Sequence, residues 1–190
     1  MNETTLHRAI PCADLQIRES PTDDGRTLCG VAVPFGVPTD VGGYVESFSR
    51  GSFTRTISER GPGRVKVLAQ HSSGVNPIGR ATVLREDPQG LYAELRISKT
   101  QAGDEALELI RDGALDGLSI GFQPVRESQD PRTGVVHRTE VRLHEISIVN
   151  WPAYDGARVA HVRSSISPLS SLDLARRRAA LVAAITGVTL

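Results

Sequence analysis

Turn-forming sequences recur along most of this chain and divide it into segments short enough to be strands. Clusters of Pro, Asp and Gly stand at Pro21–Gly25, Asp87–Gly90 and Asp130–Gly134, between runs with alternating apolar residues. Because turns of this composition join neighbouring strands, they predict antiparallel hairpins. The expected arms are Leu15–Glu19 with Thr27–Val33, Gly79–Glu86 with Leu91–Ile97, and Leu118–Val125 with His137–Val149.

A further strand and two helices complete the expected elements. Val65–Gln70 alternates as a half-buried strand does. A short helix is expected over residues 53–60, and a better one over residues 102–112, which carry an apolar stripe and are followed by Gly113. Many short strands with few helices predict a mainly β or α+β fold. We expect a mostly antiparallel, closed or nearly closed β-barrel with peripheral helices.

Composition limits the core and the partners. The 190 residues are enough for one domain, or one domain with a tail. Of these, 39% are hydrophobic and only 4% aromatic, which predicts an aliphatic core. The 22 basic and 22 acidic residues cancel, and nucleic acids or anionic membranes usually require a basic surplus. We therefore expect neither as a partner, and no stacking of bases on aromatic side chains.

Cysteine content and hydropathy indicate the compartment. Cys12 and Cys29 are too few for a disulfide scaffold or a cysteine-rich metal site. There is no apolar run long enough to cross a membrane, and the opening sequence MNETTLHRAIPCADL has no signal-peptide core. We expect a soluble protein of a reducing compartment that uses neither a metal nor a cofactor.

The composition changes near both ends. Residues 1–14 are expected to be a flexible leader, residues 15–162 a single domain, and residues 163–190 a Ser-rich linker with a basic C-terminal helix. That helix either packs on the domain, frays from it, or is a detachable segment that meets a partner. The sequence leaves these alternatives open.

His71 and Ser119 are candidates for chemistry because of their surroundings. His71 ends the strand Val65–Gln70, a position that would place an imidazole at the rim of a barrel. Ser119 is flanked on its own strand face by Gly117 and Gly121, which would leave room for a substrate backbone. A serine hydroxyl becomes a good nucleophile only when a base takes its proton. Either residue could equally be structural.

Glu145 is the third candidate. By period-two alternation it shares a strand face with Leu143 and Ser147, and a carboxylate among apolar groups needs a partner. An imidazole or an arginine would serve; an imidazole held in this way becomes a competent base. His71, Ser119 and Glu145 thus supply a base, a nucleophile and an orienting acid from three separate strands.

Several short motifs resemble those of the prohead, or capsid-maturation, proteases of tailed phages. The similarity runs in order over about residues 15–160. The opening matches are Gly30–Phe35 and Gly51–Phe53. The motifs that carry the resemblance most strongly are Gln70–His71, Pro77–Arg80, Gly117–Phe122, Glu145–Val149 and Trp151–Ala153.

The resemblance implies a fold like the herpesvirus assemblin protease and a serine endopeptidase that acts inside the immature capsid, in the host bacterial cytoplasm. It implies the major capsid protein and its scaffold segment as substrates, self-processing, and dimers or transient self-association. Matched by position, Ser119 is the nucleophile, His71 the general base and Glu145 the third member. In the herpesvirus relatives the third member is a histidine, and His144 adjoins Glu145. We favour Glu145 because the motif aligns there.

Two other functions are compatible with parts of the sequence. The same barrel could be a catalytically inactive assembly factor, although all three candidate residue types are present. A metal-dependent hydrolase using His71 and His144 lacks the HExxH or CxxC spacing of such sites. The oxyanion donors, the cleavage-site preference and any trimming of the C-terminus cannot be read from the sequence.

Overall fold

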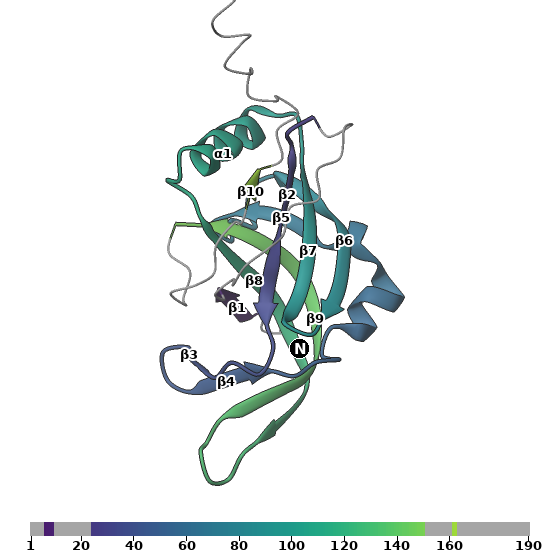
Figure 1. The fold of residues 1–190 in the computed structure, drawn as a ribbon, viewed down its shortest axis with the longest axis vertical. Coiled ribbons are helices and arrows are strands. Elements are labelled where there is room, and N and C mark those ends of the chain that lie inside the picture. The colour runs from purple at the N-terminus through teal and green to yellow at the C-terminus, as the bar shows by residue number, and fades with distance from the viewer. Residues whose placement is uncertain (1–5, 10–23, 151–160, 163–190) are drawn as a thin grey trace, which may run out of the picture.

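The computed structural model describes residues 6–9, 24–150 and 161–162, and Figure 1 shows a curled sheet with few helices. The helical segments are a π-helix η1 (Thr56–Arg60), a 3-10 turn η2 (Pro62–Arg64) and α1 (Gln101–Arg111). The strands are β1 (Leu6–Ala9), β2 (Thr27–Pro34), β3 (Thr39–Asp40), β4 (Val45–Phe48), β5 (Lys66–Ala69), β6 (Gly79–Asp87), β7 (Gly90–Ile97), β8 (Gly117–Gln129), β9 (Val136–Val149) and β10 (His161–Val162).

Where the structure describes the chain, the elements expected from local patterns are present. β6 and β7 form the predicted hairpin, as do β8 and β9. α1 matches the predicted helix to within a residue: Thr100 caps its start by accepting a hydrogen bond from the Gly103 N–H, 3.2 Å away. It ends before Gly113, whose φ of 82° suits glycine. The mainly β fold class is thus confirmed.

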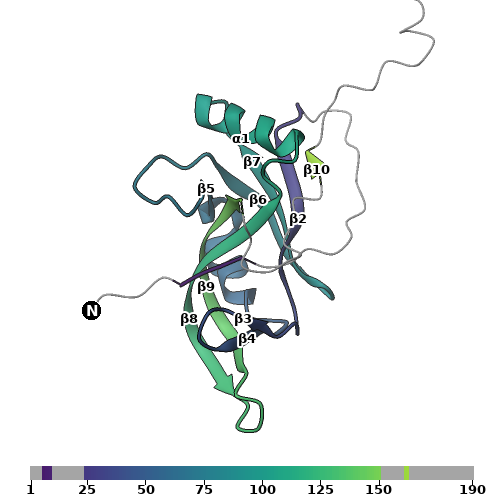
Figure 2. The ribbon, with the colours of Figure 1, turned by 90° about the vertical axis from the view of Figure 1, so that its left-hand side faces the viewer.

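The sheet is mixed rather than mostly antiparallel, and its strand order does not close. The order is β1-β8-β9-β5-β6-β7-β2-β10, so the sheet curls into a half-barrel with β1 and β10 at the ends of that order (Figures 1 and 2). β9 pairs in parallel with both β5 and β4. The prediction of a mostly antiparallel barrel is therefore only partly right. Turn signals report pairings between neighbours in sequence, and the parallel pairs join distant segments.

The core is largely aliphatic, as predicted, but every phenylalanine of the chain takes part in it. Phe48 stacks on Phe53 at 5.6 Å between centroids and meets Phe122 edge-on at 5.2 Å, while Phe35 lies 6.3 Å from Phe53. These contacts lie where β4, β8 and the start of the helical segment converge. The few aromatic residues are thus gathered into one cluster that joins these elements.

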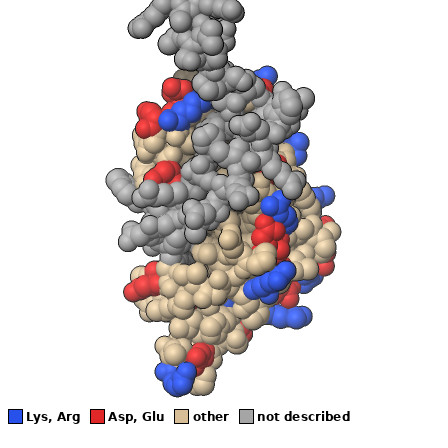
Figure 3. All heavy atoms as spheres, viewed as in Figure 1, with Lys and Arg blue, Asp and Glu red and all other residues tan. Residues whose placement is uncertain are grey.

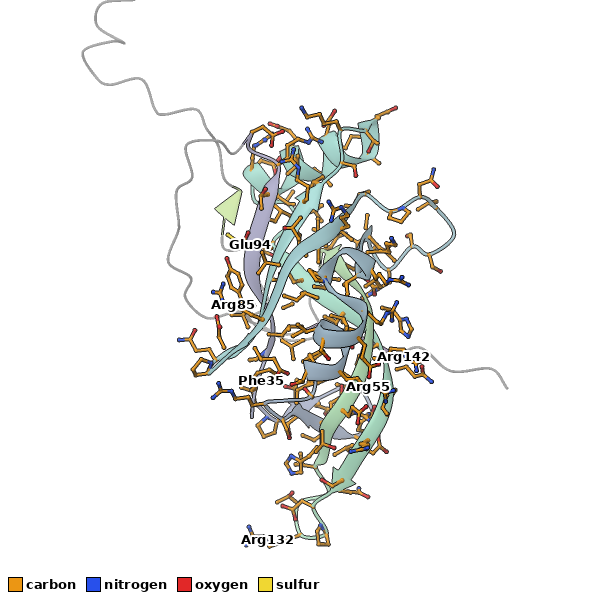
Figure 4. The ribbon with its side chains drawn as sticks, turned by 90° about the vertical axis from the view of Figure 1, so that its right-hand side faces the viewer. Phe35, Arg55, Arg85, Glu94, Arg132 and Arg142 are labelled. Carbon is orange, nitrogen blue, oxygen red and sulfur yellow. The ribbon has the colours of Figure 1, made fainter. Side chains whose placement is uncertain are left out.

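A buried ion pair connects β4 to β9 next to this cluster. The Arg138 side chain is 4% exposed, and its Nε donates to Glu46 Oε2 at 2.8 Å. The same guanidinium also donates to the Tyr44 hydroxyl at 2.7 Å and to Glu127. Beyond this point the β8–β9 hairpin extends away from the sheet, with Arg132 at its tip (Figure 4).

Several expectations fall outside the described residues. These are the strand Leu15–Glu19, Cys12, the Trp151–Ala153 motif, and the linker and helix of 163–190. The segment 1–14, for which the composition predicts a flexible leader, contributes β1, and the rest of it is not described. Cys29 is a buried free thiol. Among the described helices, none is long and apolar enough to cross a membrane. Figure 3 shows acidic and basic side chains interspersed on the described part of one face.

Candidate active site

His71 lies directly after β5, in a backbone conformation that the neighbouring strand imposes. Gln70 and His71 have φ values of 52° and 54°, the left-handed region that non-glycine residues rarely adopt. The Gln70 N–H donates to the carbonyl of Ile148 at 3.0 Å, and the His71 N–H donates to Ser147 Oγ at 3.2 Å. β9 therefore turns the chain so that the imidazole stands at the end of β5.

The register of the sheet brings the three candidate residues to one place. Ser119 on β8 lies opposite Ser147 on β9, and Gly121 lies opposite Glu145. Directly opposed residues present their side chains on the same face. β5 runs parallel to β9 on its other side, so the segment that follows β5 reaches the same face. Residues that are far apart in sequence therefore meet across three adjacent strands.

The side chains form a continuous hydrogen-bonded chain. His71 Nε2 is 2.6 Å from Ser119 Oγ, and His71 Nδ1 is 2.7 Å from Glu145 Oε1. A carboxylate only accepts, so Nδ1 carries the proton that is donated to Glu145. In the neutral imidazole Nε2 is then the acceptor, and the Ser119 hydroxyl donates to it. This tautomer leaves the ring nitrogen next to the hydroxyl free to take a proton.

Ser147 is a member of this cluster that the sequence analysis did not single out. Its hydroxyl donates to Glu145 Oε2 at 2.6 Å and accepts the backbone N–H of His71. The residue is completely buried. The Ser147 hydroxyl thus hydrogen-bonds both to the Glu145 carboxylate and to the backbone of His71, which has the left-handed conformation. Its place two residues after Glu145 on the same strand was the only available signal.

The face on which Glu145 lies differs in one respect from the prediction. Alternation placed Leu143 on the same face, but Leu143 packs in the core with Ile146. The register of β8 against β9 shifts at this point, because Gly121 opposes Glu145 whereas Phe122 opposes Leu143. His144 is the extra residue and is half-buried. A β-bulge of this kind re-aims the following side chain, here away from the core.

Gly121 makes room for the Glu145 carboxylate. A Cβ at Gly121 would lie 2.3 Å from Glu145 Oε1 and 2.9 Å from its carboxyl carbon. Both distances are far below normal contact, so any side chain at this position would displace the carboxylate. The structure thus gives this glycine a role that the sequence analysis did not foresee, which is to allow the close packing of Glu145.

The comparisons with known proteins identify the family and the fold of this chain. A family model described as the caudovirus prohead serine protease matches residues 13–171. The chain belongs to the caudovirus prohead serine protease family. The prohead protease of Enterobacteria phage HK97 is 26% identical over 116 residues, which are 60% of this chain and 51% of that protein. The chain thus matches about half the length of this curated relative.

A solved structure shares the fold. The bacteriophage T4 capsid assembly protease superposes with a TM-score of 0.57 at 15% identity, over 78% of this chain and 98% of that one. The predicted resemblance to prohead proteases is therefore confirmed at the level of family and of fold. In this member of the family, the matched span includes His71, Ser119 and Glu145.

The candidate site of this prohead protease family member is largely closed. Ser119 is 1% exposed and Glu145 5%, while the His71 side chain keeps 23% of its surface. Within the described residues no cluster of His, Cys, Asp and Glu could hold a metal ion. The groups that face one another are a hydroxyl, an imidazole and a carboxylate, a set suited to nucleophilic acyl transfer.

Proposed function

We propose that this chain is a serine endopeptidase of prohead maturation that cleaves capsid and scaffold protein and processes itself. The observation that carries the proposal is the chain of contacts from Ser119 Oγ through the His71 ring to Glu145 Oε1, at 2.6 and 2.7 Å. Family membership supports the same reaction class. The substrates we propose are the major capsid protein and its scaffold segment, met inside the immature capsid in the host cytoplasm.

In the proposed mechanism, Ser119 Oγ attacks the peptide carbonyl while His71 Nε2 takes its proton. Glu145 keeps the ring in the Nδ1–H tautomer and stabilises the imidazolium that forms. His71 then protonates the leaving amine, and water hydrolyses the acyl-enzyme by the same route. The developing oxyanion requires hydrogen-bond donors, for which backbone N–H groups suffice.

Ser147 is assigned a positioning role in this mechanism. It does not meet the substrate, because its hydroxyl is engaged by Glu145 and by the His71 backbone. A buried carboxylate with one oxygen on the imidazole and the other on a hydroxyl has a fixed orientation. Glu145 is preferred to His144 as third member because Glu145 contacts His71 Nδ1.

The decisive experiment is co-expression with the capsid protein of the same phage, read as a shift in the size of that protein. The Ser119→Ala variant should abolish processing, since losing the nucleophile of such a triad costs about 10⁴- to 10⁶-fold in rate. Ser73→Ala is the matched control, because Ser73 is an exposed serine in the loop after His71. Processing that persists in Ser119→Ala would refute the assignment.

A fluorophosphonate probe separates this proposal from an inactive assembly factor on the same fold. An active triad should be labelled at Ser119, as located by mass spectrometry, and Ser119→Ala should not. An assembly factor without serine chemistry would stay unlabelled while capsids still formed. Sedimentation of the purified chain, alone and with capsid protein, tests the proposed self-association.

A further inference from the structure

The edge of β8 that faces away from β9 is occupied by the chain's own β1. The pairing is antiparallel, with Ala9 opposite Ser119, His7 opposite Gly121 and Leu6 opposite Phe122. β1 stands at the end of the strand order, so in the described part of the chain it pairs with β8 alone. Figure 2 shows the short purple strand lying against β8.

This position lies next to the candidate nucleophile that a substrate must reach. Ser119 is 1% exposed, although a peptide carbonyl must approach its hydroxyl. β9 flanks Ser119 on one side of β8, and β1 flanks it on the other. The backbone of the candidate nucleophile is thus paired on both sides with strands of its own chain, one of which is only four residues long.

Extended peptides commonly bind proteins by adding a strand to a sheet edge, because the unpaired N–H and C=O groups of the edge supply the hydrogen bonds. The edge of β8 beside Ser119 offers such groups to a peptide whose backbone must pass close to the nucleophile. β1 pairs with residues 119–122, including Ser119 itself. β1 and a peptide bound in this way would therefore compete for the same backbone groups.

We propose that Leu6–Ala9 is an intramolecular occupant of a peptide-binding edge on β8, and that an extended segment of a substrate protein binds by displacing it. The proposal rests on the function proposed above and adds a regulatory step to it. The closed form holds Ser119 beside β1, and the open form exposes the edge of β8. A substrate segment that pairs with more of β8 than four residues replaces β1 readily, whereas a short peptide does not.

Proline substitutions in β1 provide a test with its own control. Successive residues of an antiparallel strand point their N–H groups alternately toward the neighbour and away from it. Of the variants His7→Pro and Arg8→Pro, one therefore removes a hydrogen bond to β8, and the other removes an N–H that faces away and is tolerated at a sheet edge. Hydrogen exchange of the wild-type amides shows in advance which is which, because the N–H that bonds to β8 is protected.

The readout is the rate at which a fluorophosphonate probe labels Ser119. The variant that breaks the bond should be labelled roughly two- to tenfold faster than wild type, the effect of one backbone hydrogen bond on the open population. The other variant should match wild type. Equal rates in all three proteins, with unchanged melting temperatures, would overturn the proposal.

A second measurement does not depend on catalysis. Here both proteins carry Ser119→Ala, and one of them also carries the proline that breaks the hydrogen bond to β8. A fluorescent peptide of residues 1–12 should bind the protein with the proline more tightly than the protein without it. A scrambled peptide is the control. Equal affinity in both proteins, or no binding to either, overturns the proposal about β1. If this binding difference is found but Ser119 is never labelled, the proposed protease function is refuted, whereas the proposal that β1 occupies a peptide-binding edge of β8 is supported.

Discussion

Replacing Gly121 by alanine tests the geometry of the candidate triad without substituting any of its three residues. The added Cβ would lie 2.3 Å from Glu145 Oε1, whereas ordinary contact begins at 3.4 Å. The two atoms must therefore separate by about 1 Å, and a shift of that size in a catalytic group costs about 10²-fold in rate. Glu145 has little room to absorb the shift elsewhere, because its other oxygen is held by Ser147.

We expect Gly121→Ala to lower the rate of fluorophosphonate labelling, and of capsid-protein cleavage, by about 10²-fold. Gly74→Ala is the matched control: its Cβ would meet nothing within 4 Å, and its loop begins at His71. Control activity should equal that of wild type. The melting temperature of each variant shows whether it is folded.

A double variant checks that the effect passes through the carboxylate. If the alanine acts by displacing Glu145, then Gly121→Ala combined with Glu145→Ala should be no slower than Glu145→Ala alone, a clear departure from additivity. Additive losses would mean that the glycine matters for another reason. Wild-type labelling of a folded Gly121→Ala protein would refute the reasoning altogether.

Three further outcomes are expected. Ser147→Ala should lower kcat about tenfold and leave KM unchanged, since the hydroxyl orients Glu145 and does not meet the peptide; a change in KM alone would exclude this role. Glu46→Gln should destabilise the fold by about 3 kcal/mol in urea, because Arg138 would keep a buried charge with a weakened partner, whereas a loss below 1 kcal/mol would show that other groups suffice. Burial and the hydrogen bond to Glu94 raise the pKa of Tyr92 to about 12. Since the unfolded phenol titrates near 10, its contribution to stability is complete below pH 10 and is lost between pH 10 and 12; Tyr92→Phe should decline less over that range, and identical curves would contradict this.

The local elements were predictable because their causes are local. The turn Asp87–Gly90 joins two alternating runs, which fixes the β6–β7 hairpin and the pairing next to the turn, up to the register shift between Ala81 and Val83. The stripe of α1 and the glycine that follows it likewise require nothing beyond the segment itself. The candidate site residues were also predictable from their local surroundings. They are a histidine at a strand end, a serine between glycines and a carboxylate in an apolar run. His71, Ser119 and Glu145 are indeed brought together.

The relation between those elements was decided only in three dimensions. His71 and Glu145 are 74 residues apart and meet because β5 and β9 pair in parallel, for which no turn signal exists. The bulge at His144 turns Glu145 away from the core, and alternation alone cannot reveal such a shift. The second contact of the Ser147 hydroxyl, to the His71 backbone, exists only because the left-handed turn brings that N–H across to β9. Sequence patterns predict structure that forms between residues close together in the chain. The site depends instead on strand pairings between distant segments, whose register is set by packing of the whole sheet.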